Sequence, residues 1–224
     1  MNEGTLFGRD LALLYLDYGA TLLAAASGAL AAGRRGYDLS GILAIALVAA
    51  TGGGLLRDGI FLQGAPPVLV RTPTYLVVVV AAVGLVLLAG RWLHRARVFE
   101  QATELADALG LGAYAVVGMQ LAATKGMSVL GITLVGVVNA VGGGLLRDVL
   151  MRQEPILFRP GTLLGLAALA GCLAHVAMTG PLQWPPGLAA WLTIALTFAV
   201  RMTSVRLNLT TRPVRALVEP PPGP

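Results

Sequence analysis

Long apolar stretches alternate with short polar breaks along most of the chain. A helix that crosses a membrane needs about 20 mostly apolar residues. The qualifying stretches are residues 11–33, 39–57, 74–91, 105–124, 127–147, 161–179 and 187–205. Only the proline-containing break at residues 180–186 separates the last two, because residues 160–200 hold no charged side chain. The pattern predicts an all-α polytopic membrane protein with seven transmembrane helices.

The composition of the chain agrees with a membrane protein. Of the 224 residues, 56% are hydrophobic and 12% are charged, and this charged share is about half that of a soluble domain. The apolar excess excludes a soluble enzyme and a disordered chain, and the single cysteine excludes a disulfide scaffold. The net charge of +5 comes mostly from arginines at the ends of apolar stretches. That placement is typical of contact with membrane lipids, and we expect no nucleic-acid partner.

The chain also contains an internal repeat. The segment GGGLLRD at residues 52–58 recurs letter for letter at residues 142–148, an offset of 90, and Asp17 matches Asp107 at the same offset. Beyond the motif the offset falls to 88, where PVLVR is matched by PILFR. A chance identity of this length inside a wider alignment is implausible. The sequence therefore predicts a duplicated three-helix unit followed by a seventh helix.

An odd number of helices in each unit determines how the two copies are related. After three crossings the chain is on the opposite side of the membrane, so the second copy is inverted relative to the first. Inverted repeats are typical of transporters and some channels, with a pathway near the midplane between the halves. The predicted divisions are residues 1–95 for the first repeat, 96–180 for the inverted second repeat, 181–207 for the seventh helix and 208–224 for a disordered cytoplasmic tail.

The lysines and arginines predict the orientation of the chain. With seven spans, the side of the N-terminus carries Arg9, Arg57, Arg71 and Lys125. The other side carries Arg34, Arg35, Arg91, Arg95, Arg97, Arg147, Arg152, Arg159, Arg201, Arg206, Arg212 and Arg215. Basic residues concentrate on the cytoplasmic side of membrane proteins. We therefore expect the N-terminus outside the cell and the C-terminus in the cytoplasm.

Each copy of the motif begins with three glycines, Gly52, Gly53 and Gly54 in the first copy and Gly142, Gly143 and Gly144 in the second. Three glycines cost about 2–3 kcal/mol of helix propensity relative to alanine, so they must serve another purpose. One purpose is a kink that exposes backbone carbonyls to a cation pathway. The other is close packing of two helices. The two purposes are compatible, and the sequence leaves both open.

Each copy of the motif ends in an arginine and an aspartate. Ionisable groups within a membrane-spanning segment are energetically costly, and they normally form ion pairs or face water. From the repeat geometry we predict two ion pairs, Asp17–Arg57 and Asp107–Arg147, that flank the two mouths of a pathway. The alternative is that these charges only anchor helix ends at the lipid headgroups. The candidate charged residues are Asp17, Arg57, Asp58, Asp107, Arg147 and Asp148.

Two further polar residues are candidates for the pathway. Lys125 is the only lysine and lies between two predicted helices, where its repeat counterpart is Arg35. It is interpreted as an interfacial anchor or a pathway residue. Asn139 lies deep in an apolar stretch, and it either lines a pathway or forms a hydrogen bond with another helix.

Metal-binding and enzymatic patterns are not found in the sequence. His94 lies in a basic loop and His175 is alone in its apolar stretch, so no metal site is predicted. No glycine-rich loop ending in Gly-Lys-Ser or Gly-Lys-Thr is present, so no nucleotide cofactor is expected. The pair Ser27 and His175 faintly resembles intramembrane proteases, but the first glycine of that motif is missing. We expect a protein that is not an enzyme.

The doubled Gly-Gly-Gly-x-x-Arg-Asp motif in a layout of two inverted three-helix units and one extra helix resembles the prokaryotic trimeric intracellular cation (TRIC) channel family. Bacterial members are often described as glycine-transporter-domain membrane proteins. The resemblance covers about residues 11–207 and extends to LDY at residues 16–18 and ASGAL at residues 26–30. It implies a homotrimer, a potassium-permeable pore inside each protomer and helices bent at the glycines. The short chain without a lysine-rich tail resembles the bacterial branch, which implies a bacterial plasma membrane.

Two functions remain open on the sequence. A monovalent cation channel with its pore between the two inverted repeats is the first. Secondary transporters use inverted repeats as well, so a carrier of a small solute such as glycine is the alternative. A channel has a continuous pore and passes single-channel currents, whereas a carrier shows slow, saturable uptake.

Overall fold

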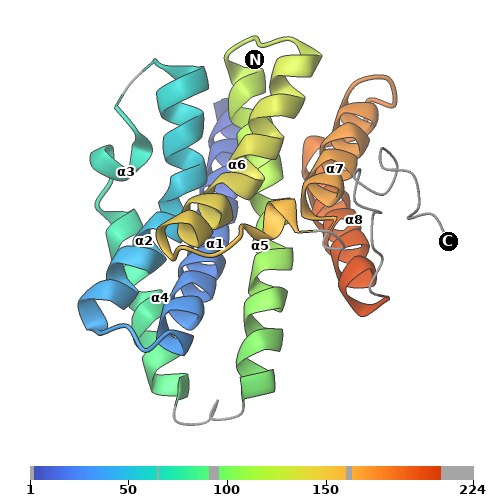
Figure 1. The fold of residues 1–224 in the computed structure, drawn as a ribbon. Coiled ribbons are helices and arrows are strands. Elements are labelled where there is room, and N and C mark those ends of the chain that lie inside the picture. Colours follow the sequence, from blue (N-terminus) through green and yellow to red (C-terminus); the bar gives the residue numbers. More distant parts are fainter. Residues whose placement is uncertain (1–2, 65, 91–95, 160–162, 208–224) are drawn as a thin grey trace, which may run out of the picture.

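The computed structural model describes residues 3–64, 66–90, 96–159 and 163–207, and this part of the chain is helical, with no strand. The elements in chain order are α1 (Glu3–Arg34), α2 (Leu39–Leu56), η1 (Arg57–Leu62), α3 (Val68–Arg71), α4 (Thr74–Gly90), α5 (Ala96–Thr124), α6 (Val129–Leu150), η2 (Ile156–Phe158), α7 (Leu164–Thr179) and α8 (Pro186–Arg206). Figure 1 shows their arrangement. The seven predicted transmembrane helices correspond to α1, α2, α4, α5, α6, α7 and α8, which confirms the predicted fold class.

Two of the seven helices are short for a membrane span. Helix α4 has 17 residues and α7 has 16, and at about 1.5 Å of rise per residue they are shorter than a hydrocarbon core of about 30 Å. Each of them follows a short helical turn, α3 or η2, in which a proline carbonyl accepts a backbone hydrogen bond. The N–H of Val70 donates to the carbonyl of Pro67 at 2.9 Å, and that of Phe158 donates to Pro155 at 3.0 Å. The segments that match at an offset of 88 therefore fold alike.

The turns that join α1 to α2 and α5 to α6 are also built alike. Gly36 has a φ of +72° and Gly126 a φ of +68°, a left-handed conformation that glycine adopts without steric cost. After each turn a polar side chain caps the next helix. Asp38 accepts a hydrogen bond from the N–H of Gly41 at 2.8 Å, which lowers the pKa of this carboxyl below its usual value. The two copies thus repeat the same backbone geometry.

Helices α2 and α6 cross at the two glycine triplets. A Cβ atom on Gly53 would overlap the carbonyl oxygen of Asn139, and a Cβ atom on Gly143 would overlap that of Ala49. Ala49 and Asn139 are themselves equivalent at an offset of 90, so the contact is symmetric between the repeats. Absence of side chains lets the two backbones touch at this point. Of the two purposes considered for the triplets, these contacts support close packing of the helices.

Both crossing helices keep their regular form through the triplets. Helix α2 is α-helical over Leu39–Leu56 and α6 over Val129–Leu150. The first departure from α-helical hydrogen bonding is the π-helical η1, Arg57–Leu62, which follows α2 directly. The glycines therefore do not interrupt helical hydrogen bonding, and a bend of either helix axis stays a prediction.

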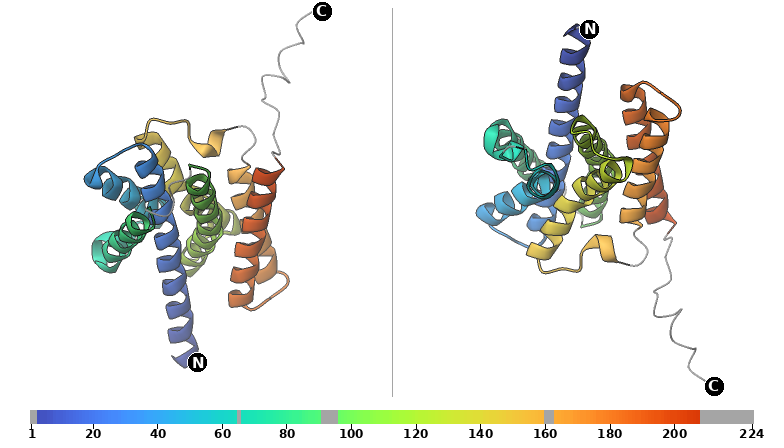
Figure 2. Two further views of the ribbon diagram at one scale, coloured as in Figure 1. Left: turned by 90° about the horizontal axis from the view of Figure 1, so that it is seen from below. Right: turned by 90° about the horizontal axis from the view of Figure 1, so that it is seen from above.

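The seventh helix lies outside the repeated units. Figures 1 and 2 show α7 and α8 side by side on one flank of α5, with α1, α2 and α4 on the other flank. Helix α8 approaches α5 at Gly112, where a Cβ atom would lie 2.8 Å from the Cα of Ile194. The predicted boundary at residue 95 and the predicted tail at residues 208–224 lie outside the described residues. The divisions of the chain stay predictions.

Candidate functional site

Three cavities adjoin one another inside the helical bundle, and we name each by its arginines. The Arg57 cavity, of about 20 Å³, includes Asp17, Arg57, Asp58, Tyr75 and Tyr114 in its wall. The Arg147 cavity, of about 50 Å³, includes Asp107, Tyr114, Gly143, Arg147, Asp148 and Arg201. The arginine vestibule, of about 520 Å³, includes Arg34, Arg35, Glu104, Asp107, Arg147, Arg159 and Arg201.

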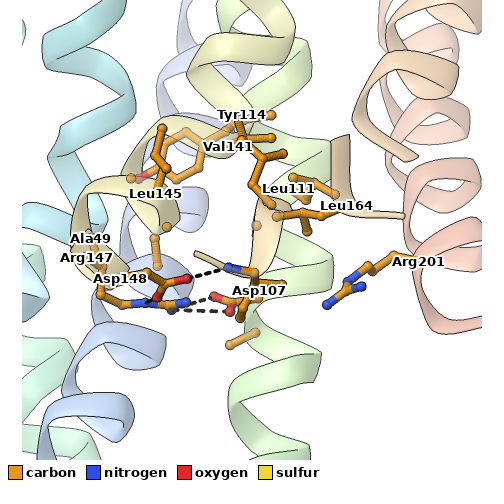
Figure 3. Close-up of a pocket in the computed structure, with 18 residues that line it drawn as sticks. Ala49, Asp107, Leu111, Tyr114, Val141, Leu145, Arg147, Asp148, Leu164 and Arg201 are labelled. Carbon is orange, nitrogen blue, oxygen red and sulfur yellow. Dashed lines mark hydrogen bonds and ion pairs between the residues drawn. The ribbon is translucent and has the colours of Figure 1, made fainter. Parts of the chain in front are cut away.

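Arg147 lies in the Arg147 cavity and contacts two carboxylates. Its Nη1 donates to both carboxylate oxygens of Asp107 at 3.2 Å, and its Nε donates to Oδ1 of Asp148 at 2.9 Å. Figure 3 shows Arg147 between these two side chains. Ser27 of α1 completes the cluster, because it accepts from Nη1 of Arg147 at 2.6 Å and donates to Asp107. The predicted contact between Asp107 and Arg147 is present.

Asp148 accepts hydrogen bonds from two donors besides Arg147. Its Oδ1 accepts from the side-chain amide of Gln153 at 2.8 Å, and its Oδ2 accepts from the backbone N–H of Ile156 at 2.9 Å. Asp148 is buried, so these donors replace water around its charge. Residues that follow α6 are thereby fixed against the motif, and Asp148 has a structural role in this cluster.

The Arg57 cavity does not repeat this arrangement. Nε of Arg57 donates to Oδ1 of Asp58 at 2.7 Å, as its counterpart does, but the predicted Asp17–Arg57 ion pair is wrong. Asp17 accepts a hydrogen bond from the hydroxyl of Tyr75 in α4 at 2.5 Å. Nη1 of Arg57 is directed to the side-chain oxygen of Asn139 at 3.5 Å instead. The difference arises because α4 supplies a tyrosine that satisfies the Asp17 carboxylate.

Tyr114 separates the Arg57 cavity from the Arg147 cavity and belongs to the wall of both. Its hydroxyl donates to the backbone carbonyl of Ala50 in α2 at 2.5 Å and lies 3.3 Å from the Thr21 hydroxyl. The backbone carbonyl of Tyr114 accepts from the Asn139 amide at 2.7 Å. Tyr114 is therefore fixed at both its backbone and its ring tip, at the level where α2 crosses α6.

The two other predicted polar residues are not among the residues that line these three cavities. Asn139 is buried and forms the hydrogen bonds to Tyr114 and Arg57 described above, which join α6 to α5 and to η1. Lys125 is exposed in the turn between α5 and α6, and its Nζ lies 3.0 Å from the position that a Cβ on Gly64 would take. Its counterpart Arg35 instead donates to the carbonyl of Met151.

Sequence reasoning missed several residues of the site, among them Ser27, Tyr75, Tyr114 and Arg201. Ser27 and Tyr114 lie within apolar stretches, Tyr75 lies at the start of α4, and Arg201 belongs to the helix outside the repeats. None of them has a counterpart of the same type at the repeat offset, so the repeat carried no signal for them. A polar residue inside an apolar stretch was the only available signal, and it applies to Ser27 and Tyr114 alike.

Comparisons with known proteins agree with the fold and the repeat. The family model described as "Glycine transporter" matches twice, at residues 14–91 and 104–179. A UPF0126 membrane protein of Deinococcus radiodurans is 35% identical over 225 residues, which cover 98% of this chain and 100% of that protein. The UPF0126 inner membrane protein YadS of Escherichia coli (strain K12) is 30% identical over 195 residues, 87% of this chain and 92% of that protein.

A solved structure gives the same result. The TRIC trimeric intracellular cation channel orthologue from Rhodobacter sphaeroides superposes with a TM-score of 0.79 at 28% identity, over 88% of this chain and 99% of that chain. These relatives are described as membrane proteins and as a cation channel. With the family model matched in both repeats and the fold shared over nearly the whole chain, the protein belongs to the glycine-transporter-domain membrane proteins of the prokaryotic TRIC family.

Proposed function

We propose that the protein is a monovalent cation channel, permeable to potassium, whose pathway runs inside each protomer between the two repeats. The observation that carries this proposal is the series of adjoining cavities, each lined by residues of both repeats. The Arg57 and Arg147 cavities share Tyr114, and the Arg147 cavity and the arginine vestibule share Asp107, Arg147 and Arg201. Neighbouring cavities are therefore separated only by the side chains that they share.

The walls of the two narrower cavities fit a cation. Carboxylates of Asp17 and Asp58 in one cavity, and of Asp107 and Asp148 in the other, attract cations, while the paired arginines limit how tightly an ion is held. Conduction requires such a balance, because an ion must both enter a site and leave it. We propose that a bend at Gly52–Gly54 in α2 and at Gly142–Gly144 in α6 adds backbone carbonyls to the pathway when it conducts.

Tyr114 is the residue that closes the route in this proposal. Its ring stands between the two narrow cavities, and its hydroxyl is bonded to the backbone of α2 beside the crossing with α6. A small shift of α2 against α6 would break this hydrogen bond and move the ring. Opening of the pathway would then consist of a rotation of Tyr114 together with a local bend of α2.

We further propose a homotrimer in the plasma membrane of a bacterium, with the N-terminus outside and the C-terminus in the cytoplasm. The orthologue from Rhodobacter sphaeroides is described as trimeric, and YadS is an inner membrane protein. The orientation is supported by the arginines, of which Arg34, Arg35 and Arg159 line the vestibule on the side predicted to face the cytoplasm. Membrane lipids would cover the exposed apolar side chains.

A carrier of a small solute such as glycine is the second candidate. The description of the matching family model as "Glycine transporter" favours it. In this case Tyr114 would be one of two alternating barriers, and the substrate carboxylate would bind an arginine of the pathway. The inverted repeats fit alternating access as well.

Recording from purified protein in a planar bilayer separates the two candidates. In asymmetric KCl we expect single-channel steps whose reversal potential lies near that of potassium, and replacing K⁺ by Na⁺ on one side gives the selectivity. In parallel, radiolabelled glycine uptake into proteoliposomes is measured with the same preparation. Saturable glycine uptake without current steps would contradict a channel and establish the carrier.

A further inference from the structure

The two ends of the proposed pathway differ in their balance of arginines and acidic residues. The Arg57 cavity has one arginine, Arg57, against the carboxylates of Asp17 and Asp58. Among its described lining residues, the arginine vestibule has two carboxylates, Glu104 and Asp107, against five arginines, Arg34, Arg35, Arg147, Arg159 and Arg201. Inverted copies of one unit would by themselves give two similar mouths. The inequality must therefore come from residues that differ between the copies or lie outside them.

Arg201 is the contribution of the helix that has no repeat counterpart. It belongs to α8, is only 4% exposed, and lines both the Arg147 cavity and the arginine vestibule. In Figure 3 its guanidinium extends from α8 toward Asp107, on the side opposite Arg147. Asp107 thus lies between two cationic side chains, at the neck where the narrow cavity meets the vestibule.

A stripe of polar residues on α8 determines the direction in which Arg201 points. Thr193, Thr197, Arg201 and Ser204 are all buried and recur on one face of the helix. Gly171 of α7 leaves room for the side chain of Thr197, which a Cβ atom at that glycine would overlap. Close contact on this face holds α8 at one rotation, so that Arg201 is directed to the neck and not to lipid.

We infer that Arg201 makes cation flow through the pathway rectify, and this inference rests on the proposed channel function. A cation meets a favourable site at the Arg57 cavity and an electrostatic barrier at the neck beside Arg201. An ion driven from the favourable site toward the barrier crosses most of the voltage drop before the barrier. An ion driven in the opposite direction meets the barrier first and gains little from the voltage. Current toward the vestibule is therefore the larger one.

The charge of Arg201 is removed in Arg201→Gln and kept in Arg201→Lys, and Arg206→Gln is the matched control, because Arg206 is exposed at the end of the same helix. The measurement is the ratio of single-channel currents at equal and opposite voltages in symmetric KCl. We expect wild type, Arg201→Lys and Arg206→Gln to share one ratio different from unity. Arg201→Gln brings this ratio toward unity by about twofold, the order expected for one charge near the ion path.

A second pair of measurements does not depend on the folding of an Arg201 variant. Glu104→Gln removes a carboxylate from the vestibule and should raise the rectification ratio of the folded protein. For the wild type, raising KCl from about 0.1 M to about 1 M shortens the Debye length from about 10 Å to about 3 Å, so the ratio should move toward unity. Equal ratios for wild type and Arg201→Gln, or a ratio insensitive to salt, would overturn the inference while leaving the channel function intact. Absence of any wild-type cation current would overturn the channel function, and this inference with it.

Discussion

Gly53 of α2 packs against the backbone carbonyl of Asn139 in α6, so closely that a Cβ atom on Gly53 would overlap that oxygen. The equivalent contact joins Gly143 to the carbonyl of Ala49. The backbones of the two repeats thus touch where α2 crosses α6. This relationship explains why a motif that is unfavourable for a helix is present twice within helices.

The glycine contacts predict that the positions within a triplet differ in how well they tolerate a side chain. Gly53→Ala or Gly143→Ala should destabilise the protein by about 1–3 kcal/mol, because the added methyl group overpacks the crossing. Gly54→Ala is the matched control, since the nearest atom to its Cβ position is Nη2 of Arg57 at 3.6 Å, an ordinary contact. It should be neutral or stabilising by up to about 1 kcal/mol through helix propensity. Thermal unfolding in detergent measures all three, and equal losses for Gly53→Ala and Gly54→Ala would contradict the packing role.

The Arg147 cluster predicts strong coupling between Arg147 and Asp107. Arg147→Gln leaves two carboxylates without their main partner, and the cost of breaking a buried pair is about 3–5 kcal/mol. Asp107→Asn combined with Arg147→Gln should be milder than Arg147→Gln alone. A thermal-stability double-mutant cycle gives the coupling energy, with Arg206→Gln as an exposed control. Additive losses would show that the pair does not interact in the membrane protein as purified.

The Arg57 cavity predicts a different pattern of coupling. Because Arg57 pairs with Asp58 and the Asp17 carboxylate accepts from Tyr75, Arg57→Gln should couple more strongly to Asp58→Asn than to Asp17→Asn. Tyr75→Phe should in turn cost about 1 kcal/mol or more, because it removes a hydrogen bond to a buried carboxylate. Two double-mutant cycles by thermal unfolding compare the couplings. A stronger coupling of Arg57 to Asp17 would restore the ion pair that the repeat suggested.

The contacts of Tyr114 predict that its substitution changes channel opening more than protein stability. Tyr114→Phe keeps the ring and removes the hydrogen bond to the Ala50 carbonyl, at a cost of about 1 kcal/mol. With the ring less firmly held, the open probability of the channel should rise and the unitary conductance should stay the same. Single-channel recording reads both quantities from one trace. Tyr15→Phe, at an exposed tyrosine of α1, is the control, and an unchanged open probability in Tyr114→Phe would remove this residue as the gate.

The distribution of arginines predicts the orientation in the membrane. Lys125 and Arg206 are both exposed and lie on opposite sides of the proposed topology. Lys125→Cys should react with an impermeant thiol reagent added to intact cells, and Arg206→Cys should react only after the membrane is opened. The native Cys172 is buried, so it contributes no background. Labelling of Arg206→Cys in intact cells would invert the assignment of the two sides.

The sequence alone determined the helices and their arrangement as two inverted repeats and one additional helix. The length of each apolar stretch and the spacing between repeated motifs can be read from the sequence without knowledge of contacts. Seven spans with a repeat at 90 residues follow from them directly. The contact between Asp107 and Arg147 was also predictable, because the repeat placed both residues at the same end of neighbouring helices. The close packing of α2 on α6 was one of two purposes that the glycines left open.

The tertiary structure decided which side chains meet. The rotation of α4 brings Tyr75 to Asp17, and Arg57 pairs with the adjacent Asp58, so an ion pair expected by symmetry is absent. The position of α8 beside α5 brings Arg201 to the Arg147 cavity, although no repeat relationship connects it with that site. Rotations and crossings of helices arise from the packing of side chains between distant segments. An apolar stretch predicts that a helix is buried in lipid or protein, but it does not predict which face of the helix packs against which neighbour.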